Sequence, residues 1–289
     1  DPEQQTDWNS FMAYSVKGGA NYNITDKHNV FVNGGYFTRA PFFRYVYLDN
    51  SNTFNDGAKL ERVLSTEVGY GFRSSLFAAN ATLYRTMWMD KALTRRFADL
   101  TANMTGLNAL HQGVEIDFTL RPTTKMEIKG MASVGDWRWT DDVIADVYDE
   151  NEEYVGTVEV FAKDLSVGDA AQTTIAVGID YEVLPRLKVG FDYNYYERLF
   201  AFFNIETRTS ALNSGTNAWE LPNYHLVDFN FKYDFKLGNF NATLFGRVNN
   251  LLDTEYISDG TDGADYSYKT ATVYYGFGRT WSGSLRIRF

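Results

Sequence analysis

Residues 226–235 read LVDFNFKYDF, and their alternation decides the fold of the chain. The apolar set is Val227, Phe229, Phe231, Tyr233 and Phe235, and the polar set between them is Asp228, Asn230, Lys232 and Asp234. Because successive side chains of a β-strand point to opposite faces, this period-two pattern predicts a strand with one apolar and one polar face. The same pattern recurs at 174–183, 114–120 and 284–289. The chain is therefore predicted to be all-β.

About eleven such segments follow one another along the chain. The predicted strands are 11–24, 28–39, 61–73, 76–89, 107–121, 125–139, 171–184, 187–199, 223–236, 240–252 and 273–289. Their connections alternate between short turns and long loops, with the long loops at 40–60, 90–106, 140–170, 200–222 and 253–272. Soluble strands are typically about 5–6 residues long, whereas a tilted strand that crosses a membrane needs about 9–11. Strand length and loop alternation together predict an antiparallel transmembrane β-barrel.

Composition narrows the function classes. The 289 residues include no cysteine, which excludes disulfides, thiol nucleophiles and cysteine-based metal sites. The net charge of -10 argues against a nucleic-acid partner, because phosphate backbones attract clustered Lys and Arg. A mean hydropathy of -0.35 does not exclude a membrane barrel, since alternating strands average to near neutral. Aromatic residues make up 17% of the chain, and many stand where predicted strands meet loops, as expected of interfacial girdles.

Several short motifs appear in a fixed order along the chain. They are the aromatic-x-Arg-Ala-Pro segment within 35–43, the E-x-S-x-E-x-G-Y pattern derived from 61–70, the strand 81–85, the G-x-E segment at 112–116, the V-x-N-L-x-D-x-x-Y pattern at 248–256, and the closing strand from 275 to the terminal Phe289. In this order they resemble the barrel of TonB-dependent outer-membrane receptors. The terminal aromatic residue also resembles the signal that barrel-assembly machinery recognises.

This resemblance implies a 22-stranded barrel that is closed by an N-terminal plug domain. Eleven strands are about half of that number, so we expect 1–289 to be the C-terminal part of such a barrel. An odd strand count fits a half, because whole single-chain bacterial barrels have an even count. The plug, the TonB-contacting segment and the upstream strands are not among the residues of this sequence. An open sheet edge in lipid is not viable, so other sequence or a second chain is expected to complete the barrel.

By the same resemblance, the expected function is import of a scarce nutrient across the outer membrane of a Gram-negative bacterium, energised by TonB. Siderophores, haem, cobalamin and oligosaccharides are the implied ligand classes. The implied partners are outer-membrane lipid, the missing plug and barrel half, the TonB complex and a surface lipoprotein. The alternative is a structural or translocation-associated barrel that imports no nutrient. No cofactor is expected.

Catalysis is not expected. The three histidines, His28, His111 and His225, are scattered over a turn and two strands, and neither a G-x-S-x-G nor an H-E-x-x-H motif occurs. His111 with Asp90 or Asp99 is a conceivable catalytic pair at the rim, but the spacing of these residues gives no support for it.

Ligand contact is predicted at the end of the barrel that carries the long loops, because rings and guanidinium groups stand there. The candidates are Arg39, Phe42, Phe43, Arg44, Trp88, Trp137, Trp139 and Trp219. A second set on the polar face of the strands is predicted to face the plug: Glu115, Asp117, Asp180, Asp192, Arg247 and Arg286.

Two loops are rich in acidic residues. The 140–170 loop carries Asp141, Asp142, Asp146, Asp149, Glu150, Glu152, Glu153 and Glu159, and this charge is expected to disfavour anionic ligands nearby. Asp259, Asp262 and Asp265 are spaced as in a calcium loop. A solvated surface loop is the preferred interpretation of both segments, and no metal site is predicted.

Overall fold

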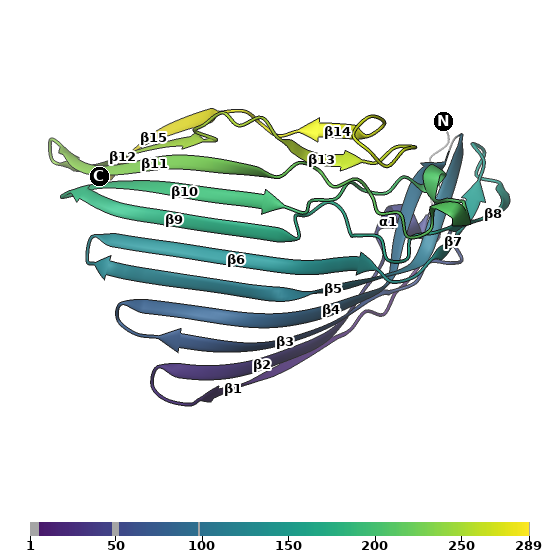
Figure 1. The fold of residues 1–289 in the computed structure, drawn as a ribbon, viewed down its shortest axis with the longest axis horizontal. Coiled ribbons are helices and arrows are strands. Elements are labelled where there is room, and N and C mark those ends of the chain that lie inside the picture. Colours follow the sequence, from purple (N-terminus) through teal and green to yellow (C-terminus); the bar gives the residue numbers. More distant parts are fainter. Residues whose placement is uncertain (1–5, 48–51, 98, 289) are drawn as a thin grey trace.

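The computed structural model describes residues 6–47, 52–97 and 99–288, and it consists almost entirely of antiparallel strands (Figure 1). Its strands are β1 (Ser15–Asn23), β2 (His28–Arg39), β3 (Glu61–Arg73), β4 (Phe77–Phe97), β5 (Leu100–Thr123), β6 (Met126–Trp139), β7 (Val143–Tyr148), β8 (Tyr154–Val160), β9 (Thr173–Leu184), β10 (Leu187–Glu197), β11 (Tyr224–Leu237), β12 (Phe240–Asn249), β13 (Ile257–Thr261), β14 (Thr272–Tyr275) and β15 (Thr280–Arg288). The helical segments are α1 (Phe43–Val46), η2 (Ile205–Arg208) and η3 (Ala211–Asn213). Phe289, the predicted terminal aromatic signal, lies outside the described residues.

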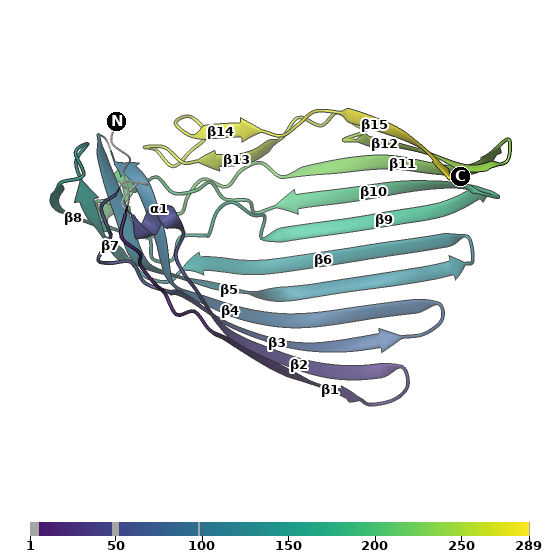
Figure 2. The ribbon, with the colours of Figure 1, turned by 180° about the vertical axis from the view of Figure 1, so that it is seen from behind.

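The eleven predicted barrel strands are confirmed. In the main sheet they follow the order β1-β2-β3-β4-β5-β6-β9-β10-β11-β12-β15, and each pairs with the next in antiparallel register. Short turns join them at one end, which we call the short-turn end. The helices and the hairpins β7–β8 and β13–β14 gather at the other, the long-loop end (Figures 1 and 2). Within the described residues β1 and β15 do not pair with each other, so the sheet is an open part of a barrel.

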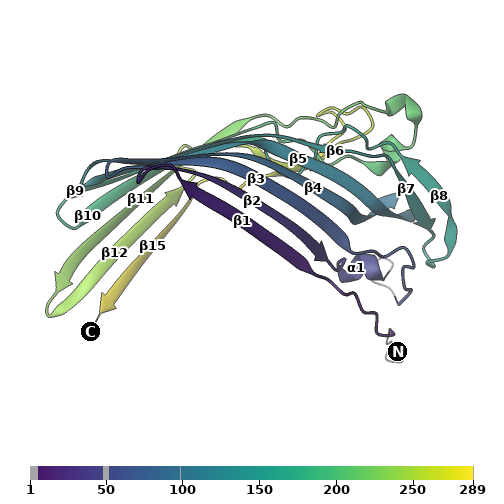
Figure 3. The same cartoon turned by 90° about the horizontal axis from the view of Figure 1, so that it is seen from below.

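Burial along the strands is the reverse of that in a soluble sheet. On β3 the side chains of Val68, Leu64 and Tyr70 are 56%, 40% and 42% exposed, whereas those of Ser65 and Glu67 are only half-exposed. The sheet is bent into an arc (Figure 3). An exposed apolar face on a bent sheet, backed by a sheltered polar face, is the arrangement of a barrel that faces lipid outside and water or polar groups inside. We call these the outward and the inward face.

Two predicted element boundaries at the long-loop end were wrong. Residues 90–106 are not a loop, because β4 and β5 continue as a paired hairpin through Arg95↔Ala102 and Phe97↔Leu100. The predicted strand 273–289 is interrupted, since β14 ends at Tyr275 and β15 begins at Thr280. Two other predicted loops contain hairpins: β7–β8 lies within 140–170, and β13–β14 spans the end of 253–272.

The long loops pack into a small domain with its own hydrophobic core, which we call the loop domain. Leu93, Ala102, Met104, Leu107, Ala109, Trp139, Val143, Ala145, Val160, Ala162, Leu165, Phe202, Phe203 and Ile205 form this core. Three connections therefore contribute to it: the outer hairpin of β4 and β5, the connection from β6 to β9 that contains β7–β8, and the segment after β10. Burial of this much apolar surface holds the loops in one arrangement. No helix among the described residues is long and apolar enough to cross a membrane.

Candidate functional site

All six predicted plug-facing residues lie on the inward face. Residues that pair directly across antiparallel strands point to the same side of a sheet. The pairs Glu115↔Ser133, Asp117↔Met131, Glu127↔Asp180, Gly178↔Asp192, Asn230↔Arg247 and Thr243↔Arg286 connect the six through β5, β6, β9, β10, β11, β12 and β15. Arg247 already forms an ion pair with Asp228, with Nη2 3.0 Å from Oδ2. Contact of this face with a plug stays a prediction.

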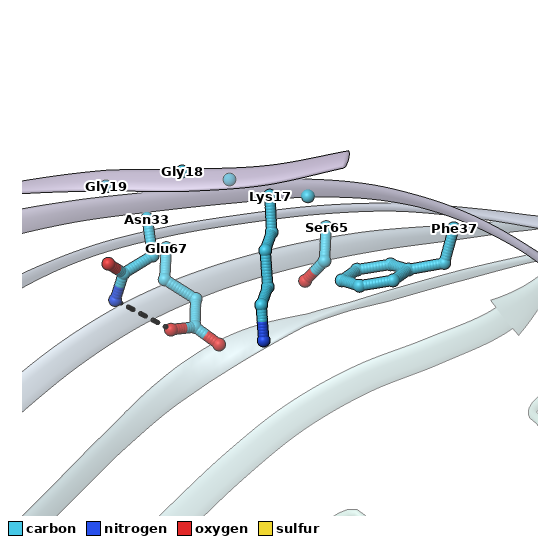
Figure 4. Close-up of a pocket in the computed structure, with 9 residues that line it drawn as sticks. Lys17, Gly18, Gly19, Asn33, Phe37, Ser65 and Glu67 are labelled. Atoms are coloured by element: carbon cyan, nitrogen blue, oxygen red, sulfur yellow. Dashed lines mark hydrogen bonds between the residues drawn. The ribbon is translucent and has the colours of Figure 1, made fainter. Parts of the chain in front are cut away.

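The inward face continues to the edge strand β1, where it is also polar. Lys17, Asn33, Ser65 and Glu67 point to the same side of β1, β2 and β3 and line a hollow of about 480 Å³ (Figure 4). Asn33 Nδ2 donates to Glu67 Oε2 at 3.5 Å. Polar side chains therefore lie on the inward face at both edges of the sheet, and Phe37 also lines this hollow.

A group of positive side chains stands at the long-loop end of the inward face. We call Arg39, Arg44, Lys91 and Arg95 the cationic cluster. Each lies against an aromatic ring: Arg39 against Phe42 and Trp88, Arg44 against Tyr45, Lys91 against Trp88, and Arg95 against Phe202. These rings come from three separate parts of the chain, so the loop packing described above assembles the cluster.

Trp88 is the centre of one half of the cluster. Lys91 Nζ is 4.0 Å from the centre of the Trp88 ring, and the Arg39 guanidinium carbon is 5.5 Å from it. The same guanidinium lies 4.8 Å from the ring of Phe42. The Trp88 Nε1 atom is buried and has no hydrogen-bond partner among the described residues. Cations held over aromatic faces in this way are partly desolvated, which strengthens their attraction for an anion.

Thr94 connects Arg44 and Arg95, which form the other half of the cationic cluster. Its carbonyl oxygen accepts from Arg44 Nη2 at 3.4 Å and from Arg95 Nη1 at 3.1 Å, so the two guanidinium groups lie side by side. The Arg95 guanidinium carbon is 4.5 Å from the centre of the Phe202 ring. Neither arginine forms an ion pair among the described residues. The two adjacent positive charges therefore repel each other without a carboxylate partner between them. A counter-charge from outside these residues would therefore stabilise the pair.

The acidic groups near the cluster compensate only part of its charge. Buried Glu61 forms an ion pair with Arg39. Burial raises the pKa of Asp169, and the negative charge of Asp259 raises it further. Burial also lowers the pKa of Lys91, and the positive charges of Arg39 and Arg95 act in the same direction. Four cations thus lie near three carboxyl groups, and burial favours the neutral form of Asp169, so the cluster carries an excess of positive charge in a chain whose net charge is -10.

The structure brings together some of the predicted ligand contacts and separates others. Arg39, Phe42, Arg44 and Trp88 lie in or against the cationic cluster. Phe43 is 57% exposed and contacts Tyr47 instead. Trp137 lies deeper on the inward face, where its Nε1 donates to the Tyr84 hydroxyl at 2.8 Å. The rings of the last two candidates pack into the loops.

Trp139 and Trp219 are the two candidates taken up by loop packing. Trp139 is only 3% exposed and lies in the core of the loop domain against Phe203. This burial removes Trp139 from the accessible candidates. Trp219 packs against the small cluster formed by Leu199, Ala201 and Leu221.

Lys91, Arg95 and Phe202 were not among the predicted contacts. Lys91 and Arg95 lie within 90–106, which the sequence pattern assigned to a loop. The alternation of Leu100, Ala102 and Met104 with polar residues was a signal that could have revealed the paired hairpin. Nothing in the sequence alone placed Phe202 beside Arg95, because 107 positions separate the two residues along the chain (202 minus 95).

The acidic and histidine candidates do not assemble into a site. Asp262 pairs with Arg208, whereas Asp265 accepts from Thr270, so these carboxylates are engaged separately. Among the described residues no group of three or more His, Cys, Asp or Glu side chains is placed to hold a metal ion. His111 lies against Trp137, while Asp90 pairs with Arg62.

Fold and face pattern together define the class: this is part of an antiparallel transmembrane β-barrel. Residues 2–251 match the family model described as TonB dependent receptor-like, beta-barrel. The chain belongs to this family, as the ordered motifs predicted. A comparison with curated proteins finds none that matches.

Solved structures of receptors and transporters share the fold. The ferric yersiniabactin uptake receptor FyuA from Yersinia pestis is 16% identical with a TM-score of 0.62, over 94% of this chain and 37% of that one. The FrpB iron transporter from Neisseria meningitidis is 16% identical with a TM-score of 0.61, over 95% and 39%. The ferric-catecholate import receptor Fiu from K12 E. coli is 16% identical with a TM-score of 0.61, over 93% and 34%. The chain thus spans little more than a third of the length of these structures.

Proposed function

We propose that this chain forms part of an outer-membrane receptor of a Gram-negative bacterium that imports an anionic nutrient ligand with energy supplied through TonB. The observation that carries the proposal is the cationic cluster on the inward face at the long-loop end. Four cations lie over aromatic rings there, and only Arg39 has a carboxylate partner within ion-pair distance among the described residues. Family membership supports the receptor role, and the named activities of the similar structures support an import role.

Both halves of the cluster favour the same ligand chemistry. Lys91, Arg44 and Arg95 offer positive charge, which attracts carboxylate or catecholate oxygens. Trp88 and Phe202 offer flat apolar surfaces on which an aromatic group of the ligand can stack. An anionic chelate with aromatic groups uses both features, whereas a neutral oligosaccharide uses only the rings. The exposed acidic residues of β7–β8 belong to a separate hairpin and do not enter the cluster.

The test is ligand binding to the whole receptor that contains this chain, purified in detergent. The probes are a ferric tris-catecholate, ferric citrate and a neutral ferric tris-hydroxamate. We expect the tris-catecholate to bind most tightly, and we expect Lys91→Met to weaken it by about tenfold, as for the loss of one partly desolvated charge contact. Lys163→Met, which removes an exposed lysine from a loop, is the matched control.

Preferential binding of the neutral probe, or equal affinities in wild type and Lys91→Met, would refute the anionic ligand. The import step is tested separately in cells. Uptake of the bound probe is expected to stop when the TonB system is removed, while binding to the cell surface remains. Uptake that persists without TonB would support a barrel of a different type.

A further inference from the structure

Strand β8 is the free edge of a part of the sheet that extends into the loop domain. The outer parts of β4 and β5 continue into β7 and then β8, and the row Leu93↔Met104↔Ala145↔Val158 crosses all four strands. Among the described residues β8 pairs with β7 alone. Figures 1 and 3 show β8 beyond β7, at the extremity of the long-loop end. Backbone N–H and C=O groups along the outer edge of β8 are therefore open to another strand.

The core of the loop domain holds this edge in a fixed position. Ala145 on β7 and Val160 at the end of β8 are both fully buried, and Val158 packs against the same core. Side chains that alternate with these point to solvent. Ile144 is 63% exposed, and Glu159, which pairs with it across the hairpin, is exposed as well. A strand added to β8 would thus meet an ordered edge with one apolar and one polar face.

β8 lacks most of the features by which edge strands avoid pairing with other strands. Its sequence, YVGTVEV, has a high strand propensity, contains no lysine or proline, and carries a single charge at Glu159. The one such feature is a bulge, which leaves Val155 without a partner on β7. From Gly156 to Val160 the pairing with β7 is regular. This regular part presents an edge that a further strand can join.

The charge around β8 is negative and uncompensated. Residues 141–160 contain no lysine or arginine and eight acidic residues, namely Asp141, Asp142, Asp146, Asp149, Glu150, Glu152, Glu153 and Glu159. In the part of the chain that the structure describes, none of these carboxylates forms an ion pair. A second copy of β8 would bring the same negative charges against them, which disfavours self-pairing. A segment that carries lysine or arginine instead relieves the repulsion.

We propose that β8 binds an extended segment of a cationic protein outside the cell, which joins the sheet as a further strand. Backbone hydrogen bonds to the free edge supply affinity, and the side chains of the segment alternate between the two faces. Lysine or arginine at every second position lies beside Thr157 and Glu159 on the polar face, and apolar side chains between them extend the face of Val158. The partner comes from outside because the long loops of outer-membrane barrels lie there. This interaction goes beyond ligand import and does not depend on the cationic cluster.

The test uses the whole receptor in detergent and, as a probe, a short synthetic peptide in which lysine alternates with threonine and valine. Fluorescence polarisation of the labelled peptide measures binding, and hydrogen exchange measures the amides of Tyr154–Val160. We expect the bound peptide to slow exchange in β8 by at least about tenfold, because open amides become hydrogen-bonded. The same peptide with N-methylated backbone amides keeps its charge but cannot donate to the ladder, so we expect it to bind far more weakly.

Charge recognition is tested with Glu159→Lys, which places a like charge beside the lysines of the peptide. We expect this variant to bind the peptide about fivefold more weakly, and we expect high salt to weaken binding to wild type. Glu255→Lys, which reverses an exposed charge in the connection before β13, is the matched control and is expected to bind as wild type does. Heat-modifiable migration on gels shows whether each variant has folded. If Glu159→Lys does not fold, Glu159→Gln replaces it, with a smaller decrease expected.

Equal binding of the parent and the N-methylated peptides would mean adsorption by charge alone and overturns strand addition. Absence of binding by the parent peptide overturns it as well, and so does wild-type affinity in the Glu159 variant. Slow exchange of the β8 amides in the receptor without peptide would show that another part of the receptor already covers this edge, which also overturns the proposal. None of these outcomes changes the expectation for ligand binding at the cationic cluster.

Discussion

Arg208 and Asp262 form an ion pair in which both side chains are fully buried, with Arg208 Nη2 2.9 Å from Asp262 Oδ2. Arg208 follows β10 and Asp262 follows β13, so the pair connects two long loops. The Arg208 guanidinium also lies 4.1 Å from the centre of the Tyr266 ring, and its backbone carbonyl accepts from the Phe161 amide at 2.8 Å. Burial raises the pKa of Asp262, although Asn204 and Arg208 oppose the shift. Three loops therefore meet at one buried charge pair.

Replacing Arg208 by Met is expected to loosen the loop domain and leave the spanning strands intact. The change leaves the Asp262 carboxyl group buried without its cation, and breaking a buried pair in this way costs about 3–5 kcal/mol. Hydrogen exchange of the whole receptor measures the effect, and faster exchange is expected in 200–222 and 253–272. Arg279→Met breaks the pair Arg279–Asp253, whose side chains are 49% and 52% exposed, and is expected to cost at most about 1 kcal/mol. Equal protection in both variants would contradict a structural role for the Arg208 pair.

Binding of an anionic ligand is expected to weaken as the pH rises above neutral. Burial against Trp88 lowers the pKa of Lys91 from 10.5, helped by Arg39 and Arg95 and opposed by Glu61 and Asp169. Lys91 therefore loses its proton at a lower pH than an exposed lysine does, and with it the charge that attracts the ligand. Folding stability depends on pH in the opposite direction. The unfolded chain binds the Lys91 proton more tightly than the folded chain does, so the free energy of unfolding rises with pH in that window.

Titration of ferric tris-catecholate binding between about pH 7 and 10 measures the effect on ligand affinity. Lys91→Arg keeps its charge over this range and is expected to flatten the profile, since an arginine stays protonated. Identical pH profiles for wild type and Lys91→Arg would show that another group causes the dependence.

The membrane-spanning part of the fold could be predicted from sequence because each strand there repeats one rule. Alternation along β11, for example, separates Phe231 from Lys232, and lipid outside with polar groups inside requires this separation at every position. The long loops do not lie between lipid and a polar interior, so no regular alternation of apolar and polar residues is imposed on their sequence. The sequence pattern places 90–106 in a loop, whereas in the structure the register of β4 and β5 shifts around Lys91 and pairing then resumes.

The candidate site could be predicted only in part, for a related reason. Arg39 and Trp88 stand at the ends of predicted strands, so their place at the long-loop end followed from strand boundaries. Arg95 meets Phe202 through loop packing around Met104, and such contacts between distant segments leave no periodic trace in one sequence. The calcium-like spacing of Asp259, Asp262 and Asp265 had the same weakness, because spacing does not reveal that Arg208 binds one of them.

Gly113 is expected to tolerate no larger side chain. It pairs with Gly135 between β5 and β6, and the Tyr84 hydroxyl lies over both glycines. A Cβ atom at Gly113 would lie 2.5 Å from the Val134 carbonyl oxygen and 2.7 Å from the Tyr84 hydroxyl. Gly113→Ala is therefore expected to lower the free energy of unfolding by about 1–3 kcal/mol through overpacking.

Gly18→Ala on β1 is the matched control for Gly113→Ala, because a Cβ atom there meets nothing within 4 Å. Heat-modifiable migration of the whole receptor at increasing temperature compares the two variants. A lower midpoint is expected for Gly113→Ala alone. A similar decrease for both variants would indicate a general effect of glycine replacement in the sheet.

Leu83 and Thr82 are neighbours on β4 that are expected to respond oppositely to the same substitution. Leu83 is 60% exposed on the outward face and pairs with Val68 and Val114, whereas Thr82 pairs with Glu115 on the inward face. Leu83→Arg places a charge in lipid, at a cost of about 2–4 kcal/mol near the middle of the bilayer. Thr82→Arg places the same charge beside the Glu115 carboxylate, and its cost is expected to be small. Urea unfolding of the receptor in lipid vesicles measures both. A larger loss of stability for Thr82→Arg than for Leu83→Arg would show that the two faces are assigned the wrong way round, and with them the location of every inward residue, including the cationic cluster.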